Sequence, residues 1–105
     1  MDSVIDEIQA RRTEIAQLCR QFHVRRLAVF GSAVAVGFDP KRSDIDFLVE
    51  FEPLEFGQYT KTYFGLLDAL AVLFARKVDL VIWKDVINPY MRQSIEASQA
   101  LLYAA

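Results

Sequence analysis

Two aspartates one residue apart, Asp44 and Asp46, stand at the start of an apolar run. In an extended strand, side chains at i and i+2 lie on the same face, about 6–7 Å apart along the backbone. Alternation therefore puts both carboxylates on one face and Ile45, Phe47 and Val49 on the other. Carboxylates this close repel one another, so they must be solvated, protonated or bound to a cation. Hard oxygen ligands of this kind suit Mg²⁺ or Mn²⁺, which commonly bind phosphates as well.

A third carboxylate and a Gly-Ser pair extend this pattern. Asp79 lies inside the apolar run 78–82, and it joins the pair if that strand neighbours the one that starts at Asp44. Gly31 closes another apolar run and is followed by Ser32. A glycine lets the backbone approach a phosphate closely, while a hydroxyl and nearby N–H groups donate to its oxygens. The combination predicts a metal site beside a phosphate site, as binding of a nucleoside triphosphate requires.

Hydrophobic spacing predicts the elements that would position these residues. They are one amphipathic helix over 2–23 capped by Asp2 or Ser3, strands over 27–30, 44–51 and 78–82, an apolar helix over 58–75, a helix over 88–97 that starts at Asn88-Pro89, and residues 101–103 as either a strand or a continuation of that helix. This order predicts an α/β (α+β) fold, with a mixed β-sheet of three to four strands flanked by helices. Residues 1–105 are expected to form a single domain.

Composition excludes several classes of protein. The chain is 53% hydrophobic and 25% charged with a net charge of −2, which argues against direct binding of nucleic acid by a basic surface. Cys19 is the one cysteine, so no intramolecular disulfide and no zinc pattern is expected. No apolar run approaches the ~20 residues of a membrane span, and the first residues lack the layout of a signal peptide. We therefore expect a cytoplasmic protein without a membrane partner.

The motifs together resemble the minimal nucleotidyltransferases of the DNA polymerase β superfamily. Their signature is Gly-Ser, about ten residues, Asp-x-Asp, and a third Asp on a later strand. The matching stretches are Gly31-Ser32, Asp44-Ile45-Asp46 and Arg76-Lys77-Val78-Asp79, and the C-terminal segment from Asn88-Pro89 to Tyr103 is similar as well. The resemblance spans nearly the whole chain and implies the nucleotidyltransferase fold.

The resemblance also implies roles for these residues. Asp44, Asp46 and Asp79 would be the catalytic residues and would bind two Mg²⁺ ions, with Mn²⁺ as an alternative. Gly31 and Ser32 would hold the triphosphate. The reaction would move a nucleoside monophosphate, AMP from ATP, to a hydroxyl group. Members of this family are often antitoxins whose partner is a helical HEPN-type ribonuclease, so a tyrosine of such a toxin is the expected acceptor.

One departure from the family pattern concerns phosphate binding. Many relatives carry an arginine three residues after the serine, where this chain has Ala35 followed by Val36-Gly37. A cation must come from elsewhere, and Lys41, Arg42 and Arg76 are the candidates; we assign Arg42 to the nucleotide site. The missing arginine keeps open an alternative function, in which a catalytically weak or inactive module neutralises a partner by binding alone.

The sequence also leaves room for contacts with other proteins. Residues 63–74 carry more apolar side chains than one buried stripe needs, so part of that helix could face a partner. A homo-oligomer is left open, and so are the nucleotide base and the identity of the acceptor.

Overall fold

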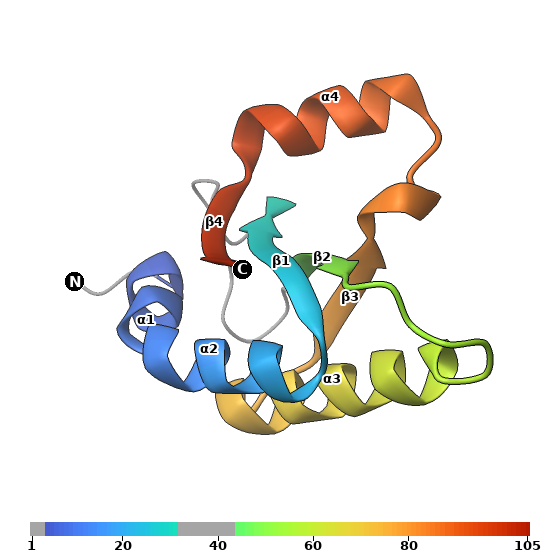
Figure 1. Cartoon of the computed structure of the whole chain (residues 1–105). Coiled ribbons are helices and arrows are strands. Elements are labelled where there is room, and N and C mark those ends of the chain that lie inside the picture. Colours follow the sequence, from blue (N-terminus) through green and yellow to red (C-terminus); the bar gives the residue numbers. More distant parts are fainter. Residues whose placement is uncertain (1–3, 32–43) are drawn as a thin grey trace.

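The computed structural model describes residues 4–31 and 44–105 (Figure 1). Its elements are α1 (Val4–Ala10), α2 (Arg12–Gln21), β1 (Val24–Phe30), β2 (Ile45–Phe51), α3 (Tyr59–Phe74), β3 (Val78–Ile82), the 3₁₀ turn η2 (Trp83–Asp85), α4 (Pro89–Ser98) and β4 (Ala100–Ala104). Asp2, Ser3, Ser32, Lys41 and Arg42, which the sequence singled out, lie outside the described residues.

The four strands form one mixed sheet in the order β3-β2-β1-β4. β1 runs antiparallel to both β2 and β4, whereas β2 and β3 are parallel. Parallel neighbours cannot be joined by a tight hairpin, and α3 supplies the crossover between them. The predicted mixed sheet flanked by helices is therefore confirmed.

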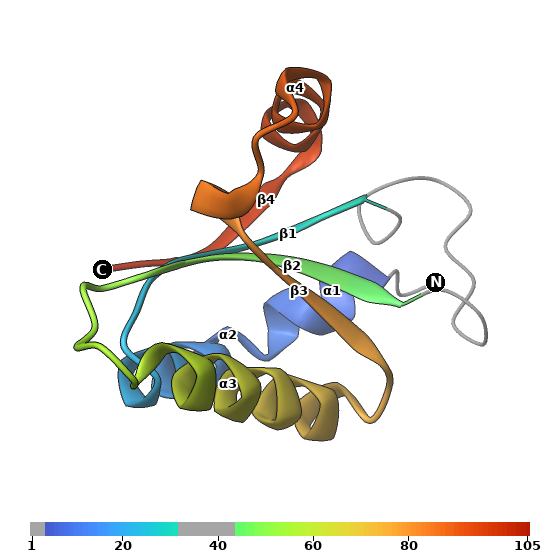
Figure 2. The ribbon, with the colours of Figure 1, turned by 90° about the vertical axis from the view of Figure 1, so that its right-hand side faces the viewer.

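The sheet has two unequal faces (Figure 2). Helices α1, α2 and α3 cover one face, and most of the buried core lies beneath them, including Ile45, Phe47 and Val49 of β2. The smaller cluster on the other face contains Phe30 and Leu48 and packs against α4 and η2. The strand alternation predicted for residues 44–51 is thus correct, because the odd-numbered side chains enter the main core and the even-numbered ones face the other way.

The helix predicted over 2–23 is in fact two helices, so that prediction is wrong in one respect. The chain bends at Arg11, with φ −104° and ψ 24°, and the Arg11 N–H donates to the carbonyl of Ile8 at 3.1 Å. The Arg11 carbonyl then accepts from the N–H of Ile15 at 3.0 Å, which starts α2. Since Ile8 and Ile15 are both buried and lie seven residues apart, their spacing is compatible with one continuous helix and hides the bend.

The two later helices agree with the expected boundaries within a residue or two. In α3, Leu66, Leu70 and Phe74 are buried, and the helix ends where Ala75 takes a left-handed conformation with φ 51°. Among the described residues, no helix combines the length and apolar character needed to cross a bilayer.

The open choice at the C-terminus resolves as a strand. Gln99 is extended after α4, and β4 then pairs with β1, with Leu102 buried in the main core. A continued helix would have left the edge of β1 without a neighbour among the described strands and Leu102 away from the sheet.

The start of α4 provides a test of the fold. The side-chain oxygen of Asn88 accepts from the N–H groups of Tyr90 at 2.9 Å and Met91 at 3.2 Å. We expect Asn88→Ala to lower the free energy of unfolding by about 1 kcal/mol, because two N–H groups lose their acceptor. Asn88→Asp keeps an acceptor and should stay close to wild type in the same urea titration. Equal losses in both variants would contradict the capping role.

Candidate active site

Asp46 and Asp79 occupy neighbouring positions in the sheet. In the parallel pairing of β2 and β3, Asp46 lies opposite Asp79, while on its other side it pairs with Phe30 of β1. Residues opposite one another project to the same face, so Phe30, Asp46 and Asp79 form one row across three strands. The row lies on the face away from α1, α2 and α3, near the end of β1 and the start of β2 and β3 (Figure 2). The sequence placed Asp79 beside Asp44 and Asp46 only if their two strands were neighbours. The pairing of β2 with β3 confirms that they are.

Gly31 closes the row at the end of β1. Its φ is +70°, and a Cβ built there would lie 2.6 Å from Oδ2 of Asp46. An L-residue is strained in this backbone region, and the added carbon would overlap the carboxylate. Glycine is therefore required here for two reasons, the chain direction at the strand end and the close approach of backbone to Asp46.

Asp44 lies two residues before Asp46, immediately ahead of β2. Its Oδ2 is 3.7 Å from Nζ of Lys77, which stands at the corresponding place before β3. The sequence reasoning missed Lys77 as a neighbour of Asp44. The pairing could have been inferred from the sequence, because a parallel register that sets Asp46 opposite Asp79 also sets position 44 opposite position 77.

The pKa of Asp46 reflects both its burial and the carboxylates beside it. Burial, the charge of Asp79, a hydrogen bond with Asp79 and the charge of Asp44, in that order, raise the pKa of Asp46 from 3.8 to about 6. Where a carboxyl and a carboxylate share a proton, a metal cation can replace that proton. Asp46 and Asp79 are therefore candidates for a pair that holds a cation.

The donor set fits a divalent cation of the Mg²⁺ type. Carboxylate oxygens are the ligands that such ions prefer, and a cation between Asp46 and Asp79 would relieve their repulsion. The part of the chain that the structure describes contains no ready-made cluster of three acidic, histidine or cysteine side chains. The pair Asp46–Asp79 is therefore the centre of the candidate site, with Asp44 on the same face of the strand.

Two further residues hold the elements around β3 together. The Tyr63 hydroxyl donates to the carbonyl of Leu80, which ties α3 to the edge strand β3 next to Asp79. Burial and the Asp79 charge both raise the pKa of Tyr63. Arg76, one of the cations considered for phosphate, lies 3.6 Å from the Glu7 carboxylate of α1. Its ion pair thus connects the turn between α3 and β3 to α1.

Comparison with known proteins identifies the family of the chain. The family model described as "Nucleotidyltransferase domain" matches residues 12–101, which include the whole row. The chain belongs to the nucleotidyltransferase family. This confirms the family and the class of enzyme that the motifs predict.

Relatives of this nucleotidyltransferase cover almost its full length. A Methanocaldococcus jannaschii protein named "Putative protein adenylyltransferase MJ0128" is 42% identical over 94 residues, which are 90% of each chain. A solved structure described as "Structure of putative minimal nucleotidyltransferase" is 28% identical, with a TM-score of 0.73 over 94% of this chain and 95% of that one.

A further structure shares the fold. It is a tri-AMPylated Shewanella oneidensis HEPN toxin in complex with an MNT antitoxin, and the match is 22% identical with a TM-score of 0.63 over 93% of this chain and 73% of that one. At this identity the likeness concerns the fold.

The carboxylate pair makes a prediction about stability and pH. Because the folded-state pKa of Asp46 lies above its ordinary value, the folded state binds the proton more tightly, so its contribution to stability is full below pH 4 and is lost as the pH rises through 6. In EDTA, Asp46→Asn should therefore be more stable than wild type at pH 7 by about 1 kcal/mol, after allowing for solvent screening, and the gain should vanish near pH 3.5.

Thermal unfolding from pH 3.5 to 7.5 measures this difference. Asp68→Asn removes one exposed carboxylate elsewhere and is the matched control for net charge. A lower melting temperature of Asp46→Asn at every pH would instead show that the carboxylate stabilises the fold.

The contact between Gly31 and Asp46 makes a second prediction for the site. Gly31→Ala should destabilise the protein by about 1–3 kcal/mol and displace the Asp46 carboxylate. Gly57 has φ +91° with nothing within 4 Å of an added Cβ, so Gly57→Ala is a control for backbone strain alone. Urea unfolding and Mn²⁺ titration should separate the two, with only Gly31→Ala weakening metal binding. Equal metal affinity in both variants would contradict the contact.

Proposed function

We propose that this chain transfers AMP from ATP to a hydroxyl group of a partner protein, with residues 1–105 acting as one minimal nucleotidyltransferase domain. The observation that carries the proposal is the row formed by Asp46 and Asp79, closed by Gly31 at a distance that leaves no room for a side chain. The similarity to a protein named as an adenylyltransferase supports AMP as the group transferred.

Each site residue has a role in this reaction. Asp44 and Asp46, with Asp79, would hold two Mg²⁺ ions, for which Mn²⁺ could substitute, and these ions supply charge stabilisation for the attacking and leaving oxygens when bound. Gly31 brings backbone next to the triphosphate, and Ser32 and Arg42 are assigned to contact it. Asp79 lies on the edge strand β3, where an incoming acceptor can reach it.

The proposed transfer needs only ATP and the acceptor hydroxyl. The acceptor oxygen forms a bond to the α-phosphorus, the bond from that phosphorus to the bridging oxygen of the β-phosphate breaks, and pyrophosphate leaves. Asp79 orients the acceptor hydroxyl and accepts its proton. The pKa of Asp46, raised by burial and by Asp79 to about 6, supports a pair that holds a proton until a cation is bound.

The acceptor is proposed to be a tyrosine of a HEPN-type helical protein, which this chain would silence as an antitoxin. The described part of the chain forms one small sheet with its helices, and we expect another molecule to present the acceptor. The shared fold with an MNT antitoxin solved beside a modified HEPN toxin supports this choice of partner.

A second candidate function is favoured by one feature of the sequence after Ser32. Many members of the family that the motifs resemble carry an arginine three residues after the serine, but this chain has Ala35 there. A module that lacks this cation could neutralise a partner by contact alone. The aspartates would then contribute to the charge and shape of the binding surface and would not act in catalysis.

Calorimetric titration of ATP tests the proposal. With Mg²⁺, wild type should bind ATP, and Asp44→Asn/Asp46→Asn should weaken binding by at least about tenfold, because the carboxylates that hold the cation are gone. EDTA should have the same effect on wild type. Glu55→Gln/Asp68→Asn removes two exposed carboxylates away from the row and should bind as wild type does. ATP binding that is insensitive to both EDTA and the double substitution would contradict the proposed site.

A further inference from the structure

Helix α3 is apolar on the side that faces away from the sheet as well as on the side that packs against it. From Thr62 to Phe74 its one charged residue is Asp68. Leu66, Leu70 and Phe74 are buried, yet Phe64 is 53% exposed and Val72 is 81% exposed. A surface helix normally presents polar residues on its outer face, and one that is apolar all round is normally covered. The outer face of α3 therefore has the composition of a contact surface.

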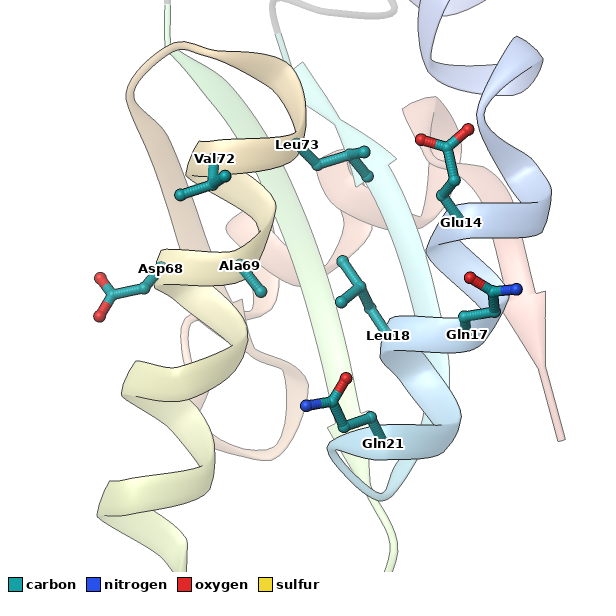
Figure 3. A pocket seen from close by; sticks show the side chains of 8 residues that line it. All are labelled: Glu14, Gln17, Leu18, Gln21, Asp68, Ala69, Val72 and Leu73. Atoms are coloured by element: carbon teal, nitrogen blue, oxygen red, sulfur yellow. The ribbon is translucent and has the colours of Figure 1, made fainter.

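A groove runs beside this face, between α2 and α3. The helices approach closely where a Cβ added to Gly65 would lie 2.6 Å from Cε1 of Phe22. The hollow has a volume of about 540 Å³ and is lined by Glu14, Gln17, Leu18, Gln21, Asp68, Ala69, Val72 and Leu73. In Figure 3, Leu18, Ala69 and Leu73 point into the gap between the two helices, whereas Asp68 points outward from α3. The floor of the groove is thus apolar and its flank is acidic.

Beyond its first turn, where Thr60 and Lys61 are exposed, the exposed side chains of α3 form a simple pattern. Phe64, Asp68 and Val72 follow one another at intervals of four residues, so they lie along one side of the helix as apolar, acidic, apolar. Asp68 makes no ion pair or hydrogen bond with a described residue. The other acidic residue of the groove, Glu14, is paired with Arg11 at 2.9 Å. Asp68, between the two exposed apolar residues, is therefore the charge that a partner would meet at the centre of this surface, with Lys61 one turn before Phe64 at its edge.

This pattern disfavours a second copy of the same chain as the occupant. A two-fold axis that packs α3 antiparallel on its own copy would set Phe64 against Val72 of the other copy. The same arrangement would set Asp68 against Asp68, with two like charges in a partly desolvated contact. A partner with the opposite charge at the centre avoids that repulsion.

We propose that the surface formed by Phe64, Asp68, Val72 and the groove beside them docks an amphipathic α-helix of another protein. That helix carries Arg or Lys at its centre and an apolar residue four positions to either side. The apolar residues pack on Phe64 and over Val72 and Leu18, and the cation reaches the Asp68 carboxylate. Helix-in-groove recognition of this kind uses anchors at helical spacing on one face.

The surface is separate from the candidate active site. It belongs to the helices that cover one face of the sheet, whereas Asp46 and Asp79 lie on the other face. The proposal therefore does not rest on the proposed function, and substitutions at Asp68 should leave ATP binding unchanged.

Two synthetic helical peptides test the proposal. Both are alanine-based, with Leu at positions i and i+8, and they differ only in Arg or Glu at i+4. In an NMR titration of the ¹⁵N-labelled protein, the Arg peptide should shift the amides of α2 and α3 and bind about fivefold more tightly than the Glu peptide. Asp68→Lys should reverse that order, and Val72→Ser should weaken both peptides. Asp85→Lys reverses an exposed charge outside the surface and should leave the order unchanged.

Three outcomes would overturn the proposal. They are equal affinity for the two peptides, amide shifts that fall outside α2 and α3, and no binding of either peptide at millimolar concentration. Sedimentation of the wild-type protein tests the other occupant. Self-association that Asp68→Ala strengthens and Val72→Ser abolishes would make a second copy the partner and would refute a heterologous helix.

Discussion

The pairing of β2 with β3 places two carboxylates side by side, and much of the site depends on that one register. Asp46 and Asp79 come from segments more than thirty residues apart, and the parallel ladder brings them opposite each other. Burial of Asp46 and then the neighbouring charge of Asp79 raise its pKa to about 6, so an ionised pair without a cation is unfavourable. The fold tolerates this cost because the same strands bury Phe47, Val49 and Leu80 on the opposite face. Stability and site chemistry are therefore divided between the two faces of one sheet.

Helix α3 connects these two strands and has more than one function. A parallel pair needs a crossover, and α3 provides it while covering the sheet with Leu66, Leu70 and Phe74. Its Tyr63 also donates to a carbonyl of β3, which stabilises the edge strand beside Asp79. The outer face of the same helix leaves Phe64 and Val72 exposed on either side of Asp68. A single element thus joins the two strands that carry the carboxylates and holds the surface for which we propose a partner helix.

Gly31 illustrates how local backbone geometry and site chemistry meet. The chain leaves β1 in a conformation that favours glycine, and the missing side chain lets the backbone lie against the Asp46 carboxylate. A residue chosen only for a turn could be replaced by asparagine, which also tolerates positive φ. The contact with Asp46 excludes that replacement, so the position is constrained by the site as well as by the turn.

The sequence by itself determined a large part of this picture. Alternation in residues 44–51 and the apolar run 78–82 predicted the strands and the face that the aspartates share, and Asn88-Pro89 predicted the start of α4. These features follow from local spacing and capping, which are written in consecutive residues. The motifs also led to the family, since Gly31-Ser32, Asp44-x-Asp46 and Asp79 occur in order along the chain.

Other features required the tertiary structure. The bend at Arg11 leaves the buried spacing of Ile8 and Ile15 intact, so periodicity could not reveal it. The strand at Ala100–Ala104 forms because β1 offers an edge, and the pairing of Asp44 with Lys77 follows only once β2 and β3 are in register. In each case the deciding contact joins residues far apart in the chain. Sequence pattern reports what a segment can become, whereas long-range packing decides which neighbour it meets.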